Sequence, residues 1–281
     1  RLRPTLFRPP GGPSRPGLPG PEGPAGTSRN IGIVGVGQAW CRLYRPAFAR
    51  VPGMVPSAFA DPADAGAFAS IEDMLGEAEL SAVVVLSPPH LHAEHVARCL
   101  GRGLPVLVEK PPALSTAEAD AWVSEGRAEL VRPAFSRRYW TRYRGAGRSG
   151  HRWEFRLETN PAAWGASTAE DVVRDLAPHA VDLARWLSGE EVRSVRVFVR
   201  SPDRLAGEFE LTAGGAFAWE VSHGAAYREE LLMDGKSVGG GGAGLPARLA
   251  RRIRRSPAQD VAGVAELLRD WARALDGGAP P

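Results

Sequence analysis

One lysine stands in an unusual place in this chain. An aspartate and a histidine further along could take part with it in proton transfer. Only two lysines occur among the 35 basic residues, and Lys110 directly follows an apolar run and precedes two prolines in VLVEKPPAL. An ammonium group that is desolvated can give or take a proton, whereas a guanidinium stays charged. Asp175 and His179 are four residues apart and would share one face of a helix. A carboxylate and an imidazole placed in this way can orient a substrate hydroxyl and accept its proton.

A glycine turn in GIVGVG is suited to binding a dinucleotide. Gly35 would make the tight turn, and Gly37 would let the backbone approach a pyrophosphate at the start of a helix. The amides near Gln38 and Ala39 would then complete the anion site. Trp40 stands where the G-x-G-x-x-G pattern has its third glycine, so the pyrophosphate grip is expected to be altered. An ordinary strand–glycine–helix turn is the alternative.

An acid follows at the end of the second predicted strand, where a dinucleotide-binding domain holds the adenosine ribose. Asp61 lies 24 residues beyond Gly37, and its carboxylate is suited to the ribose hydroxyls. No arginine or lysine occurs in 62–70 to hold a 2′-phosphate, so the sequence favours NAD, with NADP left open. The alternative is that Asp61 and Pro62 cap a turn.

The pattern of apolar residues predicts an α/β protein with two domains. Strand candidates from residue 30 and at 54–61, 81–87 and 104–109 alternate with helix candidates at 40–51, 70–77, 90–103 and 115–127. Strands that are apolar on both faces predict a parallel sheet covered by helices on both sides. Further strands at 151–158, 192–200, 207–212, 216–222 and 228–235, a helix at 171–188 and a last helix at 260–275 predict a C-terminal α+β domain with an open, mainly antiparallel sheet. The predicted boundaries are 1–29, 30–145 and 146–281.

Composition restricts the class of protein. Residues 1–29 are rich in proline, glycine and arginine, which predicts a disordered tail. The tail has five arginines and one glutamate, and its formal charge of +4 exceeds the +3 of the whole chain, so the remainder gives no indication of nucleic-acid binding. The run RLARRIRR at 248–255 would contact a polyanion, or form a solvated face or a subunit contact. Two cysteines outside any CxxC pair, with no secretory signal or membrane span, favour a reducing cytoplasmic setting without a metal site.

The ordered part of the chain resembles the Gfo/Idh/MocA family of NAD(P)-dependent oxidoreductases. The matching pieces are GIVGVG (32–37), ADP (60–62), SPPHLHAEHV (87–96) followed by VLVEKP (106–111), and DLAPHAVDLARWLSG (175–189). The resemblance implies an N-terminal Rossmann dinucleotide-binding domain and then an α/β domain whose open sheet pairs subunits. A homodimer or homotetramer through that sheet is therefore expected.

The resemblance also implies roles for the residues singled out above. Lys110, Asp175 and His179 would face the nicotinamide and the substrate. His179 would be the base, Lys110 the proton-sharing donor at the reacting oxygen, and Asp175 the orienting carboxylate.

Further residues are expected beside the cofactor because of this resemblance. Ser87 and Pro88 would form a backbone wall for the nicotinamide ribose, and Glu109 belongs to the same EKP motif as Lys110. His92 is either a cofactor neighbour or a capping or packing group. Arg138 would touch cofactor or substrate, with an ordinary domain junction as the alternative.

The predicted function is transfer of hydride between NAD(P) and a hydroxyl or carbonyl carbon of a sugar, a cyclitol or a similar polar molecule. Two alternatives remain open: a cofactor-binding regulatory or scaffold protein that has lost turnover, and an imine or enamine reductase. Trp40 and Pro178 favour the first alternative. Proline inside a helix costs about 3 kcal/mol, unless the helix begins there, in which case Asp175 precedes it and the shared-face argument weakens.

Overall fold

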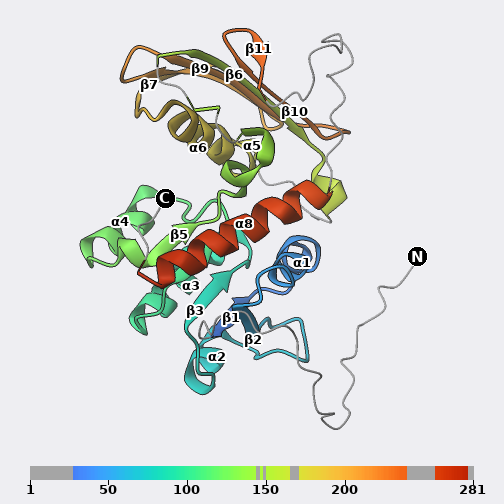
Figure 1. The fold of residues 1–281 in the computed structure, drawn as a ribbon, viewed down its shortest axis with the longest axis vertical. Coiled ribbons are helices and arrows are strands. Elements are labelled where there is room, and N and C mark those ends of the chain that lie inside the picture. Colours follow the sequence, from blue (N-terminus) through green and yellow to red (C-terminus); the bar gives the residue numbers. More distant parts are fainter. Residues whose placement is uncertain (1–27, 144–145, 148–149, 165–170, 239–256, 278–281) are drawn as a thin grey trace.

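The structure, a computed structural model, describes residues 28–143, 146–147, 150–164, 171–238 and 257–277. These residues form two units, each built on one sheet, with a long helix between them (Figure 1). The predicted tail lies outside the described residues up to residue 27, and Arg29 already begins the first strand. The arginine run at 248–255 also lies outside them.

The first sheet has five parallel strands in the order β2-β1-β3-β4-β5. Its strands are β1 (Arg29–Val34), β2 (Met54–Ala60), β3 (Ala82–Val85), β4 (Val106–Val108) and β5 (Val131–Pro133). In a parallel sheet all carboxyl ends meet at one edge. The turns that follow β1 to β4 therefore lie together, which brings Gly35, Asp61, Ser87 and Glu109 to the same edge.

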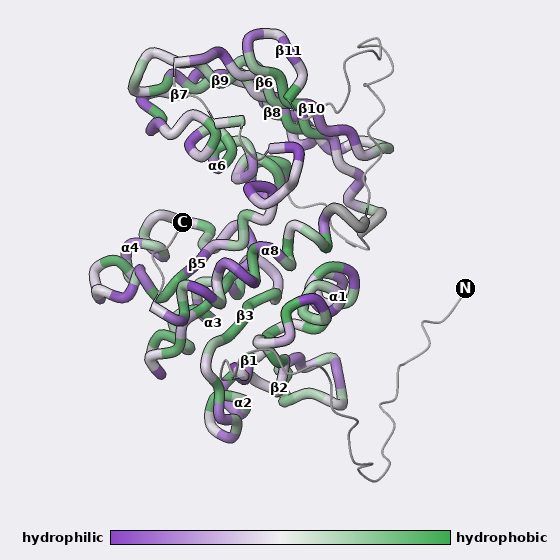
Figure 2. Tube along the Cα trace, in the orientation of Figure 1, coloured by the Kyte–Doolittle hydropathy of each residue, from purple (hydrophilic) through white to green (hydrophobic). Residues whose placement is uncertain are grey.

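Helices cover both faces of this sheet, as the apolar strands predict. Ile33 and Val84 pack on one face with the segment after β1, and Val83 and Val85 pack on the other face with α2 and α3. Figure 2 shows the hydrophobic residues along β3. The helical segments are η1 (Trp40–Tyr44, a π-helical turn), α1 (Arg45–Phe48), α2 (Ile71–Glu77), α3 (Pro89–Gly101) and α4 (Thr116–Ser124), with short 3₁₀ turns η2 (Ala128–Leu130), η3 (Ser136–Tyr139) and η4 (Thr141–Tyr143).

The last helix, α8 (Pro257–Leu275), packs into the core of the first unit. Val264, Leu268 and Trp271 are buried in the same cluster as Ile31 and Trp40. Figure 1 shows this helix lying between the two sheets. A domain division between residues 145 and 146 stays a prediction, and the chain returns to the first unit at α8.

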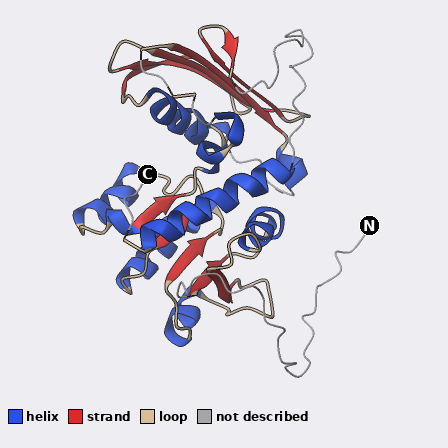
Figure 3. Cartoon of the chain, in the orientation of Figure 1, coloured by secondary structure: helices blue, strands red, loops and turns tan. Residues whose placement is uncertain are grey.

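The second sheet has six strands in the order β11-β10-β6-β9-β8-β7. All neighbouring pairs are antiparallel except β6 and β9, which are parallel, so the predicted open and mainly antiparallel sheet is confirmed. One face is covered by α6, and the other is open (Figure 3). The strands are β6 (Arg152–Thr159), β7 (Val192–Arg200), β8 (Arg204–Leu211), β9 (Ala216–His223), β10 (Arg228–Met233) and β11 (Lys236–Ser237), and a 3₁₀ turn η5 (Pro161–Trp164) follows β6.

The single helix expected over 171–188 is wrong, because two helices occupy this range. α5 (Val172–Asp175) is one turn long, and α6 (Ala177–Ser188) begins after a break at Leu176. Pro178 lies in the first turn of α6, where backbone N–H groups have no partner within the helix, so its missing donor removes no helical hydrogen bond. Asp175 therefore precedes the helix that carries His179, and the shared-face argument does not hold.

Candidate active site

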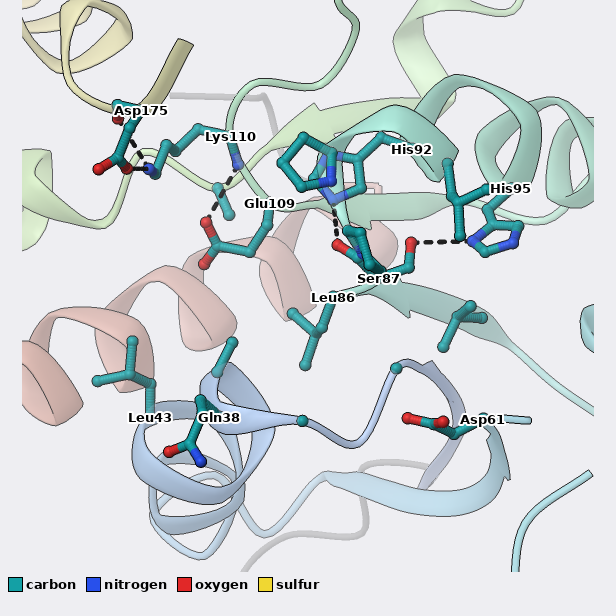
Figure 4. Close-up of a pocket in the computed structure, with 18 of the residues that line it drawn as sticks. Gln38, Leu43, Asp61, Leu86, Ser87, His92, His95, Glu109, Lys110 and Asp175 are labelled. Atoms are coloured by element: carbon teal, nitrogen blue, oxygen red, sulfur yellow. Dashed lines mark hydrogen bonds and ion pairs between the residues drawn. The ribbon is translucent and has the colours of Figure 1, made fainter. Parts of the chain in front are cut away.

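A cavity of about 930 Å³ lies at the carboxyl edge of the first sheet and extends to the second unit. Gly35 and Asp61 line it from the first sheet, and Asp175 and His179 line it from the second unit. Its size is that of a site for a cofactor or a small ligand. In Figure 4, Asp61 and Asp175 lie at opposite ends of the view.

The glycine turn is shaped by the close approach of the chain after β3. Gly35 has a φ of +92°, and a Cβ atom there would lie 2.8 Å from the carbonyl carbon of Leu86 and from the amide nitrogen of Ser87. Only glycine fits such a position without strain. At Gly37 a Cβ atom would meet no described atom within 4 Å, so the turn is open toward the cavity. These two glycines fit the approach of a pyrophosphate to the backbone.

Trp40 leaves this turn undisturbed because its side chain belongs to the core. Its ring centroid lies 5.3 Å from that of Phe59 and 6.0 Å from that of Phe48. The helical segment starts at Gln38 and widens into the π-helical turn at Trp40. The large side chain is thus accommodated beneath the first helix. The sequence predicted that Trp40 would alter the binding of the pyrophosphate.

Asp61 ties the end of β2 to the glycine turn. Its Oδ2 accepts a hydrogen bond from the backbone N–H of Val36 at 2.8 Å, and its Oδ1 accepts one from Ala63 at 2.9 Å. The second contact is the turn cap that the sequence left open as an alternative. Asp61 nevertheless lines the cavity, as a ribose ligand must.

Two histidines support the segment after β3, and both line the cavity. His92 is buried, with Nδ1 2.7 Å from the carbonyl oxygen of Pro111 and Nε2 2.7 Å from that of Ser87. Its packing role, one of the two alternatives, is therefore clear. His95 lies with Nδ1 2.9 Å from Ser87 Oγ, and burial lowers the pKa of His95, which keeps its ring neutral at pH 7. Pro88 lines the cavity beside them.

Glu109 is held by a buried tyrosine that sequence reasoning missed. Tyr44 donates a hydrogen bond to Glu109 Oε1 at 2.8 Å, and the backbone N–H of Lys110 donates to Oε2 at 3.1 Å. Burial, and then the negative charge of Glu109, raise the pKa of Tyr44 well above its usual value, so its hydroxyl stays a donor. The only signal in the sequence is a phenol within a predicted helix of the first domain.

Lys110 reaches across to the second unit and contacts Asp175 (Figure 4). Its ammonium nitrogen lies 2.6 Å from Asp175 Oδ1 and 2.8 Å from the carbonyl oxygen of Asp175. His223, which sequence reasoning missed, contacts Asp175 Oδ2 through Nε2 at 3.1 Å. Burial raises the pKa of Asp175, but the ammonium of Lys110 and the contact with His223 outweigh it, so the pKa lies below its usual value. The carboxylate is therefore ionised at neutral pH.

His179 lines the same cavity as Lys110 and Asp175, and its side chain is buried. It lies in the first turns of α6, just after the break at Leu176. The three residues predicted to be catalytic thus meet at one cavity, although they do not lie on one helix.

Arg137, and not Arg138, lines the cavity. Arg138 forms an ion pair with Asp182 on α6, which is the domain-junction alternative. Arg137 Nε lies 3.2 Å from Oε2 of Glu229, a fully buried residue of β10. The sequence prediction named Arg138 for a contact with cofactor or substrate, whereas the neighbouring Arg137 is the one that lines the cavity.

Glu229 is the centre of a buried polar cluster behind the cavity wall. It also pairs with Arg142 at 2.6 Å and accepts hydrogen bonds from the hydroxyls of Tyr143 and Tyr227. Burial raises the pKa of Glu229, but the two arginines outweigh it, so the pKa lies below its usual value. Nothing in the sequence marks this glutamate, because it occupies an ordinary position of a β-strand.

Comparison with known proteins identifies what the first unit is similar to. A model of GFO_IDH_MocA, an oxidoreductase family with an NAD-binding Rossmann fold, matches residues 29–129. The predicted resemblance to this family and the predicted NAD-binding domain are confirmed over these residues.

Curated proteins similar to this chain include inositol 2-dehydrogenases. The protein from Leifsonia xyli subsp. xyli is 32% identical over 203 residues, which cover 62% of this chain and 59% of the relative. The protein from Streptomyces avermitilis is 30% identical over 220 residues, which cover 66% of this chain and 63% of the relative. The chain spans about three fifths of the length of these relatives.

Solved structures share the fold over nearly the whole chain. A myo-inositol 2-dehydrogenase from Lactobacillus plantarum has a TM-score of 0.72 at 18% identity and covers 90% of this chain and 91% of its own. A scyllo-inositol dehydrogenase from Lactobacillus casei, with bound NAD(H) and scyllo-inositol, has a TM-score of 0.69 at 17% identity and covers 90% of each chain. At these identities the likeness shows the fold alone.

Two further findings concern the described residues as a whole. No helix among them is long and apolar enough to cross a membrane. Within the same residues, no group of three or more histidine, cysteine, aspartate or glutamate side chains is placed to hold a metal ion.

Proposed function

We propose that this chain is an NAD-dependent dehydrogenase that acts on a CH–OH group of an uncharged polyol, in particular a cyclitol. The observation that carries the proposal is the Lys110–Asp175 ion pair, which lines the same cavity as the Gly35 turn. The ammonium group of Lys110 is held at one point of a cavity large enough for a dinucleotide. It is therefore suited to donate a hydrogen bond to a reacting oxygen beside a nicotinamide. The inositol 2-dehydrogenases among the relatives support a cyclitol as the substrate.

The first unit would bind the cofactor mainly through its backbone. The amides after Gly37, at Gln38 and Ala39, would hold the pyrophosphate, and Asp61 would hold the adenosine ribose. Ser87, Pro88 and the chain around Glu109 would form the wall beside the nicotinamide ribose. NAD, when bound, supplies the acceptor for the hydride that leaves the carbinol carbon.

Three side chains would handle the proton of the reacting hydroxyl. Lys110 would donate a hydrogen bond to that oxygen, and the ionised carboxylate of Asp175 would hold the ammonium in position. His179 would accept the hydroxyl proton, because imidazole is a suitable base near neutral pH. His92 would support the wall through its contacts with the carbonyl oxygens of Ser87 and Pro111.

The charge at the far end of the cavity favours an uncharged substrate. Among the described residues, Lys110, Arg137 and Arg142 are cations at or directly behind this end, and the carboxylates of Asp175, Glu229 and Asp260 face them. Glu109 also lines the cavity, directly before Lys110, so four carboxylates lie near three cations. A sugar acid or a sugar phosphate would bring charge without a free counter-charge, whereas hydroxyl groups can use the donors and acceptors present.

NAD is the preferred cofactor in this proposal, with NADP as the alternative. Within the part of the chain that the structure describes, the lysine and arginine side chains that line the cavity are Lys110 and Arg137, and both face the second unit. The acids Asp61, Glu72 and Glu94 also line it. Carboxylates would repel a 2′-phosphate.

An oligomer formed through the second sheet remains part of the proposal. On the edge strand β7, Val195, Val197 and Phe198 are exposed. A homodimer or homotetramer would cover them, and sedimentation of the full chain at several concentrations tests this. A reducing, cytoplasmic setting stays a prediction from the two free cysteines, Cys41 and Cys99.

Loss of turnover is the second candidate, since Trp40 and Pro178 depart from the family motifs. Both residues have places in the structure that leave the glycine turn and the break before α6 intact. The test is calorimetry with NAD and with NADP, followed by turnover of inositol isomers, neutral sugars and the matching sugar acids. We expect NAD binding and oxidation of an uncharged polyol. NAD binding without turnover of any member of this panel would favour the scaffold alternative.

A further inference from the structure

His223 is the last residue of β9 and shares a carboxylate with Lys110. Asp175 Oδ2 lies 3.1 Å from His223 Nε2, while Oδ1 lies 2.6 Å from Lys110 Nζ. The histidine side chain is 9% exposed. The carboxylate of Asp175 thus connects Lys110, which follows a strand of the first sheet, to His223 of the second sheet.

The chemistry of this contact determines where the histidine carries a proton. An ionised carboxylate only accepts hydrogen bonds, and the low pKa of Asp175 keeps it ionised. His223 therefore has its hydrogen on Nε2. Asp203 is a further charged group near the ring: its carbonyl oxygen accepts the backbone N–H of His223 at 2.8 Å, and its carboxylate interacts with the ring electrostatically.

Asp175 needs such a second contact because its own helix gives it little support. α5 is a single turn that ends at Asp175, and the chain then breaks at Leu176. A carboxylate on a short helix can rotate, whereas a carboxylate with a donor on each oxygen loses one hydrogen bond when it does so. β9 lies inside the second sheet, between β6 and β8, and is a firmer support than α5.

We propose that His223 is a positioning residue of the dehydrogenase reaction, which holds Asp175 so that the carboxylate stays on the Lys110 ammonium. The proposal rests on the proposed function. His223 acts through Asp175, and the chain Lys110–Asp175–His223 connects the cofactor-binding sheet to the second sheet. Removal of the histidine should therefore affect the chemical step more than the binding of NAD.

Two substitutions separate the hydrogen bond from the bulk of the ring. His223→Leu fills the space without a donor, and His223→Gln can place an amide N–H near the position of Nε2. We expect kcat to fall about 10- to 100-fold in His223→Leu, as for a misplaced catalytic group, with the Kd of NAD unchanged. His223→Gln should recover most of kcat. Equal losses in both variants, or a loss that appears only in the Kd of NAD, would overturn the proposal.

The chain contains a matched control for a lost histidine–aspartate pair. His151 contacts Asp234 at 2.5 Å and does not line the cavity. His151→Leu removes a more exposed histidine–aspartate contact from the second unit and should leave kcat unchanged. A similar fall of kcat in this variant would mean that the loss reflects the stability of the second unit, and the proposal would fail.

A readout without turnover separates this proposal from the proposed function. Carbon-detected NMR follows the titration of the Asp175 carboxyl in the full chain. The contact with His223 helps to lower this pKa, so His223→Leu should raise it and His223→Gln should restore it in part. An unchanged titration in His223→Leu would overturn the proposal even if the enzyme is active. A wild-type chain that turns over no polyol but shows the raised pKa in His223→Leu would overturn the proposed function and support the positioning of Asp175.

Discussion

The two ends of the cavity are built by different means. At the cofactor end, Gly35 and Gly37 present backbone groups. The specificity of this end comes from the absence of side chains at these two positions. At the substrate end, Lys110, Asp175 and Arg137 are charged side chains held by partners from other elements. A backbone site should tolerate changes of neighbouring side chains such as Trp40, whose ring packs in the core, whereas a site made of ion pairs depends on each partner. Substitutions at the two ends should therefore fail in different ways.

The largest effect is expected at Glu229, because it is the buried carboxylate between Arg137 and Arg142. Glu229→Gln removes the negative charge and leaves two buried guanidinium groups. The free energy of unfolding should fall by about 3 to 5 kcal/mol, as measured when one partner of a buried ion pair is removed. Urea denaturation measures this change. Glu230→Gln, on the open face of the same strand, is the control and should cost well under 1 kcal/mol.

The lowered pKa of Glu229 predicts how the stability of the chain depends on pH. Because the pKa of Glu229 is lower in the folded chain than in the unfolded chain, its contribution is complete above the unfolded value and is lost as pH falls through the folded value. Wild-type stability should therefore fall more steeply than that of Glu229→Gln on acidification below about pH 4.5. Thermal melts across this range compare the two. Parallel curves would contradict an ionised Glu229.

Lys110→Ala tests the chemistry of the substrate end. Removal of a group that shares a proton in the reaction should lower kcat several hundredfold or more, on the scale of acid–base catalysis, which contributes about 10²- to 10⁴-fold. NAD binding, measured by calorimetry, should persist because the backbone end is unchanged. Lys236→Ala removes the other lysine, on the exposed strand β11, and should leave kcat unchanged. Turnover retained in Lys110→Ala would exclude this lysine from the reaction.

Two alanine substitutions in the glycine turn sharpen the comparison. Gly35→Ala forces a positive φ on alanine and places a Cβ atom against the chain at Leu86 and Ser87, so stability should fall by about 1 to 3 kcal/mol. Gly37→Ala meets no described atom and should leave stability within about 1 kcal/mol, while the methyl group weakens NAD binding. Thermal melts and calorimetry measure the two effects. Undiminished NAD affinity in Gly37→Ala would place the pyrophosphate elsewhere.

The smallest effect is expected from Tyr44→Phe, which removes one hydrogen bond to Glu109. The cost should be about 1 kcal/mol of stability, because the glutamate keeps the backbone N–H of Lys110. A modest change of kcat should accompany it, since Glu109 directly precedes Lys110. Tyr139→Phe, which loses a hydroxyl contact with Asp270 away from the cavity, is the control and should lose stability without a change of kcat.

Much of the first unit could be predicted from local patterns. Strands such as β3 are apolar on both faces, and a strand of this kind must be covered on both sides, which gives the parallel sheet and its helices. The glycine turn and the acid after β2 have fixed places relative to those strands. The second sheet was also visible, because its strands alternate between buried and exposed residues. Such periodic signals lie within a few neighbouring residues and need no knowledge of the rest of the fold.

The sequence alone therefore determined the two sheets, the resemblance to the Gfo/Idh/MocA family and the position of Lys110 at the end of a buried strand. Only the tertiary structure decided that Asp175 joins Lys110 to His223, that Arg137 instead of Arg138 lines the cavity, and that α8 returns to the first unit. Each of these depends on a contact between residues far apart in the chain. A polar side chain makes such a contact at a single position, so the contact leaves no periodic pattern in the sequence. The break before α6 shows how one proline can move a carboxylate off the expected helix face.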